Sequence, residues 1–155
     1  MRSSMGVEAG LRKIIVAFDG SNDAVKAISL ACALTLKFGS ELIVVHVFSS
    51  PSVGYSATSG MPIPDYKALE DAKRASAKEV LSKGMQLATK EGVEAKGELI
   101  EAPSVVEGLV EFAGNEKADL VVTGTRGMTG FKKLIMGSVS SGLVNHAHCP
   151  VLVAR

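Results

Sequence analysis

The sequence lacks several features that would assign it to a well-marked class of protein. Its two cysteines, Cys32 and Cys149, form no Cys-x-x-Cys pair and have no cluster of metal-ligating side chains near them, so we expect both to be unbridged packing residues. No apolar run approaches the roughly 20 residues that span a bilayer, and residues 1–10 contain no apolar signal core. A net charge of +1, from 17 basic and 16 acidic residues, gives no global field that favours nucleic acid or an anionic membrane. We therefore expect a soluble, cytoplasmic protein without a nucleic-acid or membrane partner.

What the chain does contain is a regular alternation of apolar runs and helical patterns. Short apolar runs predict strands at residues 13–18, 42–48, 97–101, 120–123 and 150–154. The second run is apolar throughout, as in parallel strands covered on both faces, whereas the third alternates with charge as a half-exposed edge strand does. With a helix between each pair of strands, this order predicts a single α/β domain over residues 11–155 with a doubly wound, parallel five-stranded sheet and helices on both faces. Residues 1–10 are predicted to be a flexible N-terminal segment.

The helices are marked by their end signals. Ser21 is predicted to cap the first helix and Gly39 to end it, and the capping box Ser104-x-x-Glu107 begins the third. The longest helix is predicted over residues 65–91, and a short one over about 138–146. The predicted buried stripe of the longest helix consists of Leu69, Ala72, Ser76, Val80 and Leu87. The Ser/Gly/Pro-rich residues 49–64 are predicted to be a loop beside the ligand crevice that a nucleotide orders.

A glycine-rich segment after the fourth predicted strand indicates a phosphate site. Gly124-x-x-Gly127 is followed, after nine residues, by Gly137-Ser138 at the start of the last helix. Glycines allow a sharp turn and let a ligand approach bare N–H groups, and a helix N-terminus attracts anions. We expect the N–H groups of residues 138–140 and the hydroxyls of Ser138 and Ser140 to bind phosphate, although Ser138 also fits a plain helix cap.

Other candidate residues follow from the rule that open α/β sheets bind ligands beyond the carboxyl ends of their strands. Asp19 ends the first strand there and is expected to bind ribose hydroxyls or a phosphate-bound Mg²⁺, with an Asx turn as the alternative. Arg126 either reaches phosphate oxygens or is a solvated cation. Lys132 and Lys133 are interpreted as a solvated face. His46 is interpreted as a hydrogen-bonded strand-end histidine whose neighbour offers backbone groups to a base.

Taken together, these patterns resemble the universal stress protein family, in its ATP-binding branch. The resemblance covers residues 11–155 and rests on Asp19-Gly20-Ser21, His46-Val47, the glycine segment and the closing Pro150-Val-Leu-Val153. It implies an adenine nucleotide alpha hydrolase-like fold with strand order 3-2-1-4-5, a homodimer paired through the last strand, and ATP as a regulatory ligand. The site residues that it implies are Ala17, Asp19 and Val47 for the adenosine, and Thr123, Gly124, Arg126, Gly127, Gly137, Ser138, Val139 and Ser140 for the phosphates. Ala17 departs from the proline of some members.

Competing functions lack their own signatures. The chain has no Gly-x-x-x-x-Gly-Lys-Ser/Thr, which disfavours a P-loop NTPase. Residues 18–23 lack the leading Ser-Gly-Gly of ATP pyrophosphatases, and Glu101-Ala102 stands where a phospho-receiver domain needs an aspartate. No glutamate, glutamine or histidine in the glycine segment can orient a water, so we expect a nucleotide-dependent stress-response regulator with slow or no ATP hydrolysis. The alternative is an interaction protein of the same fold with an empty site or another nucleotide.

Overall fold

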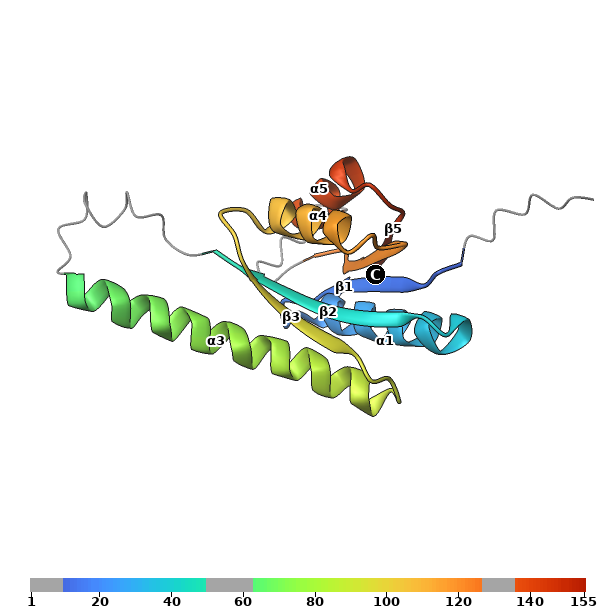
Figure 1. The fold of residues 1–155 in the computed structure, drawn as a ribbon, viewed down its shortest axis with the longest axis horizontal. Helices are drawn as coiled ribbons and strands as arrows, with labels where there is room; N and C mark the ends of the chain where they lie inside the picture. Colours follow the sequence, from blue (N-terminus) through green and yellow to red (C-terminus); the bar gives the residue numbers. More distant parts are fainter. Residues whose placement is uncertain (1–9, 50–62, 127–135) are drawn as a thin grey trace, which may run out of the picture.

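The computed structural model describes residues 10–49, 63–126 and 136–155, and its centre is one parallel sheet. The sheet has five strands in the order β3-β2-β1-β4-β5, with parallel pairing throughout (Figure 1). The strands are β1 (Lys13–Ala17), β2 (Glu41–Phe48), β3 (Lys96–Glu101), β4 (Leu120–Gly124) and β5 (Val151–Ala154). The strand order and the edge position of β3 confirm the predictions. The order reverses direction at β1, where the chain crosses from β3 to β4 on the other side.

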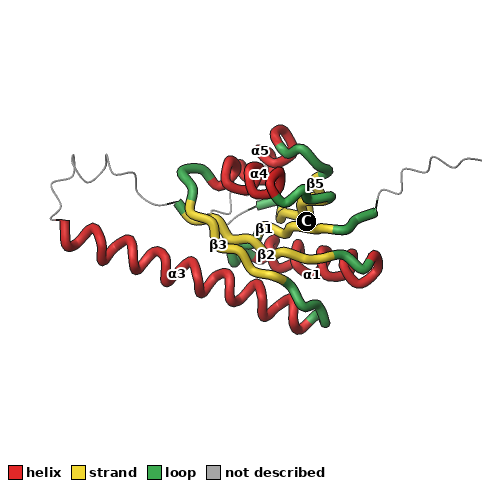
Figure 2. The backbone as a smooth tube through the Cα atoms, viewed as in Figure 1, coloured by secondary structure: helices red, strands yellow, loops and turns green. Residues whose placement is uncertain are grey.

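Helices form a layer on each face of the sheet. They are α1 (Asn22–Phe38), α3 (Ile63–Lys90), α4 (Val105–Asn115) and α5 (Ser138–His146). Figures 1 and 2 show α1 and α3 on one side of the strands and α4 and α5 on the other. None of the helices within residues 10–49, 63–126 and 136–155 has the length and apolarity needed to cross a membrane.

The predicted helix ends are confirmed by their local bonds. Ser21 Oγ accepts the Ala24 N–H at 3.2 Å, and Ser104 Oγ accepts the Glu107 N–H at 3.3 Å. Each bond satisfies an N–H group that has no partner inside its helix. Gly39 ends α1 with a φ of 66°, a left-handed conformation that glycine adopts without a Cβ penalty.

The core consists of two apolar layers, because the strands are buried on both faces. Ile14, Val16 and Val44 pack toward α1 and α3, whereas Ile15 and Val45 pack toward α4 and α5. This alternation follows from the period of two along a strand, and the continuous apolar runs supply both faces. Fixed between two helix layers, the strand ends form a rigid base for a site.

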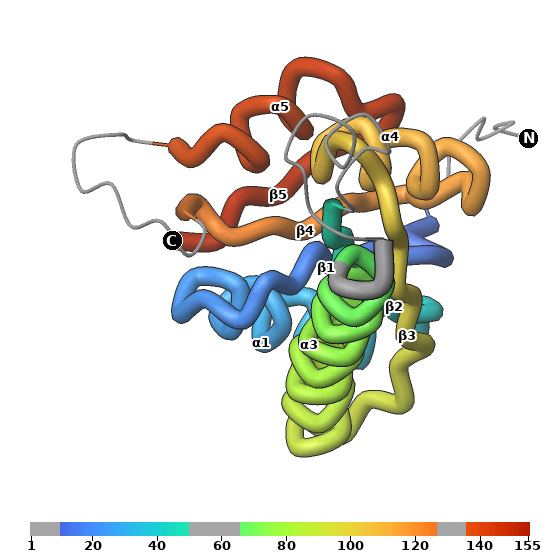
Figure 3. Tube along the Cα trace, turned by 90° about the vertical axis from the view of Figure 1, so that its left-hand side faces the viewer, coloured from blue at the N-terminus to red at the C-terminus, as the bar shows by residue number. Residues whose placement is uncertain are grey.

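The predicted buried stripe of α3 is wrong over the first half of the helix. Leu69, Ala72 and Ser76 are exposed, and the most buried positions are Ala77, Gly84 and Ala88. The first half extends past the end of the sheet in Figure 1, and Figure 3 shows α3 nearly end-on beside β2 and β3. A helical stripe therefore identifies a face but not the length of helix that has a surface to pack against.

Both cysteines are free, as predicted. Cys32 is fully buried in α1, and this burial, together with the nearby charge of Glu91, raises the pKa of its thiol to about 11. Burial also raises the pKa of the Cys149 thiol. Both thiols are therefore predominantly protonated and weakly nucleophilic at neutral pH.

Candidate functional site

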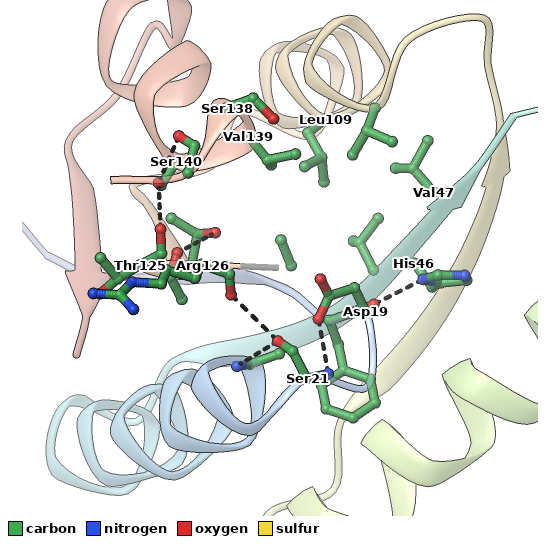
Figure 4. Close-up of a pocket in the computed structure, with 18 residues that line it drawn as sticks. Asp19, Ser21, His46, Val47, Leu109, Thr125, Arg126, Ser138, Val139 and Ser140 are labelled. Carbon is green, nitrogen blue, oxygen red and sulfur yellow. Dashed lines mark hydrogen bonds between the residues drawn. The ribbon is translucent and has the colours of Figure 1, made fainter. Parts of the chain in front are cut away.

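A pocket of about 240 Å³ lies beyond the carboxyl ends of β1, β2 and β4, below the start of α5 and beside α4 (Figure 4). This is the point at which the strand order reverses, as the rule for open sheets predicts. The pocket lining contains the predicted site residues Ala17, Asp19, Val47, Thr123, Gly124, Arg126, Gly137, Ser138, Val139 and Ser140. Gly127 lies outside the described residues, as do Lys132, Lys133 and most of the loop predicted at 49–64.

One side of the pocket is an apolar wall. Ala17 and Val47 come from the ends of β1 and β2, and Val139 comes from the first turn of α5. Val105 and Leu109, one turn apart on α4, complete the wall. Sequence reasoning did not identify the α4 residues as site residues, because a helical apolar pair has the same pattern whether it faces the core or a ligand. An apolar wall of this kind suits a flat, uncharged group.

The N-terminus of α5 adjoins this wall at Val139. Gly137 is the N-cap and makes no side-chain capping bond, unlike Ser21 in α1 and Ser104 in α4. The interpretation of Ser138 as a plain cap is therefore wrong. The helical bonds begin with the Ser141 N–H, which donates to the Gly137 carbonyl at 3.0 Å, so the N–H groups of residues 138–140 have no partner within the helix. Such groups, at the positive end of the helix dipole, bind anions.

Ser140 contributes differently from what the sequence predicts. Its side chain is buried, with 1% of the residue exposed, and its hydroxyl lies 2.9 Å from the Thr125 carbonyl and 3.1 Å from the Gly137 carbonyl. The single hydroxyl proton is shared between these carbonyl oxygens, so it is not directed at a phosphate. The hydroxyl instead fixes the first turn of α5 to the end of β4.

Thr125 joins three elements at the edge of the pocket and was not predicted as a site residue. Its N–H and its Oγ1 hydroxyl both donate to the Ala154 carbonyl, at 2.8 and 2.6 Å. Its own carbonyl accepts the Gly137 N–H at 2.6 Å as well as the Ser140 hydroxyl. The end of β5 and the start of α5 are thus held to one buried residue.

Gly124 is explained by packing and not by ligand approach. A Cβ on Gly124 would lie 2.7 Å from the carbonyl carbon of Asp23 and 3.0 Å from the Ala24 nitrogen. The missing side chain therefore faces the start of α1, on the opposite face of the sheet from α4 and α5. The expectation that this glycine makes room for phosphate is corrected: it makes room for a helix.

Asp19 and Arg126 lie on the polar rim. Asp19 Oδ1 accepts the Ser21 N–H at 2.9 Å, which is the Asx turn named as the alternative, while the carboxylate still lines the pocket. The Arg126 N–H donates to Asp23 Oδ2 at 3.2 Å, and its carbonyl accepts from Ser21 Oγ at 3.4 Å. In Figure 4 the Arg126 guanidinium points away from the apolar wall. Among the described residues, no three His, Cys, Asp or Glu side chains converge on a metal position.

Comparison with known proteins agrees with this architecture. Residues 10–155 match the sequence pattern of the universal stress protein family. A universal stress protein of Methanocaldococcus jannaschii is 33% identical over 145 residues, which are 93% of this chain and 82% of the relative. The structure of a universal stress protein from Archaeoglobus fulgidus has a TM-score of 0.72 and 27% identity, covering 93% of each chain.

A second solved structure adds a ligand to the comparison. It is the universal stress protein from Archaeoglobus fulgidus in complex with dAMP, with a TM-score of 0.69 and 24% identity, covering 93% of this chain and 98% of that one. At this identity the likeness shows a shared fold. The match over residues 10–155 and the relative that is 33% identical together show that the chain belongs to the universal stress protein family.

Proposed function

We propose that this protein binds an adenine nucleotide, ATP with Mg²⁺, as a regulatory ligand in the stress response. The observation that carries the proposal is the combination of an apolar wall and an uncapped helix N-terminus in one pocket. A nucleotide has the matching chemistry, with a flat base at one end and an anionic phosphate chain at the other. The complex of the Archaeoglobus fulgidus protein with dAMP supports this class of ligand for the fold.

We assign a role to each side of the pocket. The base packs against Val47 and Leu109, and the ribose lies toward Asp19, whose carboxylate accepts hydrogen bonds from ribose hydroxyls. The phosphates lie at the N–H groups of residues 138–140. The pocket, at about 240 Å³, is smaller than the roughly 300–1,000 Å³ of typical ligand pockets, so it encloses the base and sugar and leaves the phosphates at the exposed Ser138.

Magnesium fits this arrangement only as a companion of the phosphates. Mg²⁺ prefers oxygen ligands, keeps several waters and is commonly held by one or two carboxylates together with substrate phosphates. Asp19 is a carboxylate at the described rim that can play this part, directly or through water. The ion would screen the phosphate charge.

We expect binding without fast turnover. Hydrolysis needs a group that positions the attacking water. Within the described lining, the Asp19 carboxylate is assigned to the ribose side of the pocket and the Ser140 hydroxyl donates to carbonyl oxygens. Phosphate release measured in single turnover should therefore be slower than about 1 per second. ATP then acts by favouring one arrangement of the protein over another.

The test uses two substitutions at Ser138, the first residue of α5. Ser138→Pro removes the N–H group but suits the first helical position, and the extended Gly137 (ψ 170°) accommodates a following proline. Ser138→Ala removes the hydroxyl and keeps the N–H. Calorimetric titration should show ATP binding by the parent and by Ser138→Ala. Binding should be weakened about 10- to 150-fold in Ser138→Pro, because a hydrogen bond to a charged group contributes about 1.5–3 kcal/mol.

The same titration separates the candidate functions. Equal affinity in all three proteins would remove α5 from the phosphate site. Saturable binding of AMP without a gain from the further phosphates of ATP would assign a nucleoside monophosphate. If the folded parent binds no adenine nucleotide, the remaining candidate function is that of an interaction protein of the same fold.

A further inference from the structure

The main-chain hydrogen bonds that pair β1 with β2 end at Phe18. The Phe18 N–H donates to the Val45 carbonyl at 2.9 Å, and among the described residues the main-chain bonds between these two strand ends stop there. In a parallel ladder that continued, the Phe18 carbonyl would accept the Val47 N–H. It is instead 2.8 Å from His46 Nδ1 (Figure 4).

This contact determines which nitrogen of His46 carries a proton. A carbonyl oxygen only accepts hydrogen bonds, so Nδ1 must be the donor. The imidazole is therefore the Nδ1–H tautomer when it is neutral. The ring replaces a main-chain N–H at the point where the ladder would otherwise add one more bond.

The consequence falls on Val47. Residues along a strand direct their N–H and C=O groups alternately to the two neighbours, and the Val45 carbonyl faces β1. The Val47 groups face the same way, but β1 has ended at Ala17. The main-chain groups of the alternate residues of β2 face β3, as the Phe48 carbonyl shows by accepting the Ala102 N–H at 3.1 Å. The main-chain donor and acceptor of Val47 are thus turned toward the pocket that this residue lines.

We propose that His46 is a positioning residue that holds the Phe18 carbonyl away from the Val47 N–H, so that the Val47 N–H and C=O are open to the edge of the base. The proposal rests on the nucleotide-binding function above. One adjacent donor and acceptor match adenine, which offers the ring N1 as acceptor and the N6 amino group as donor. The hypoxanthine base of inosine has an N1–H and a carbonyl there, the reverse order, and does not match.

The test compares two substitutions at His46. In His46→Asn the side-chain amide nitrogen occupies the position of Nδ1 and can donate to the Phe18 carbonyl, whereas His46→Leu has no donor. Calorimetric titration with ATP should show an affinity close to that of the parent for His46→Asn and a loss of about three- to tenfold for His46→Leu, the worth of one hydrogen bond. Binding of inorganic tripolyphosphate, which has no base, should be equal in all three proteins.

The outcomes separate this proposal from the function on which it rests. No ATP binding by the parent would refute the nucleotide function itself. ATP binding that is equal in the parent and His46→Leu, or lost equally in His46→Leu and His46→Asn, would overturn the role of His46. A measurement on the parent protein tests the proposal even if His46→Leu does not fold. ¹⁵N NMR of the His46 imidazole should show the Nδ1–H tautomer, and the Nε2–H tautomer would overturn the proposal.

Discussion

Replacing Gly124 by alanine tests whether this glycine serves packing or ligand binding. The added Cβ would lie 2.7 Å from the Asp23 carbonyl carbon, so β4 and the start of α1 must separate by roughly 0.8 Å to restore a normal carbon contact of about 3.5 Å. Backbone strain is not involved, because the described glycines with positive φ are Gly20, Gly39 and Gly92. The contacts of the added Cβ are with main-chain atoms of Asp23 and Ala24 and with the Asp23 Cβ, none of which can rotate away as the end of a side chain can.

The expected cost is that of an overpacked core. Such insertions destabilise by about 1–3 kcal/mol, which exceeds the gain of about 0.4–1 kcal/mol that alanine brings by restricting the unfolded chain. The net loss is about 0.6–2 kcal/mol, so with an m value of about 2 kcal/mol/M the urea midpoint should fall by about 0.3–1 M. The matched control is Gly114→Ala in α4, where the nearest atom lies at an ordinary 3.6 Å, and alanine should be neutral or stabilising by up to about 1 kcal/mol.

Nucleotide affinity gives the second half of this test. The Cβ would face α1 and not the pocket, so the folded fraction of Gly124→Ala should bind ATP within about twofold of the parent. A variant as stable as the parent that no longer binds nucleotide would refute the packing explanation and restore a ligand-approach role for Gly124.

Three further perturbations have expected outcomes. Thr125→Val removes the hydroxyl bond to Ala154 and should cost about 0.5–1.5 kcal/mol in urea unfolding, whereas Thr125→Ser should recover most of it. The raised pKa of Cys32 means that the folded protein favours the protonated thiol. The free energy of unfolding should therefore be fully retained below the thiol pKa of the unfolded chain, 9.0, and should fall as the pH rises through about 11. In Cys32→Ala this fall should be less steep. We propose a homodimer through β5, and light scattering should show a dimer that Val153→Pro separates without unfolding, whereas Leu152→Pro should break the sheet. The main-chain N–H and C=O of Leu152 pair with β4, while those of Val153 face outward. A monomeric parent at micromolar concentration would refute the pairing.

The fold was predictable because its signals are local. The apolar run that became β2 and the Ser21 and Ser104 caps each depend on a few adjacent residues, and strand ends in a parallel sheet meet at one edge whatever the helices do. The predicted rim residues outside the undescribed segments therefore came together in one pocket. The strand order followed from the resemblance and not from the patterns alone.

What could not be predicted depends on contacts between distant residues. The reason for Gly124 lies about a hundred residues earlier, at Asp23, and the partner of Thr125 is Ala154 at the end of the last strand. The exposure of Leu69 follows from how far α3 extends past the sheet, which a helical stripe does not encode. The contribution of Leu109 to the pocket required the position of α4 above the ends of the strands.

The most direct test of nucleotide binding is a titration of the full chain with ATP and Mg²⁺, observed through the backbone amide signals in ¹⁵N NMR. We expect saturable binding of one nucleotide per chain, with the largest shifts at Val47 and residues 138–140 and little change at the amino ends of the strands, such as Lys13. No saturation up to about 1 mM ATP, an affinity of only about −4 kcal/mol, or shifts confined to residues outside the pocket would contradict it.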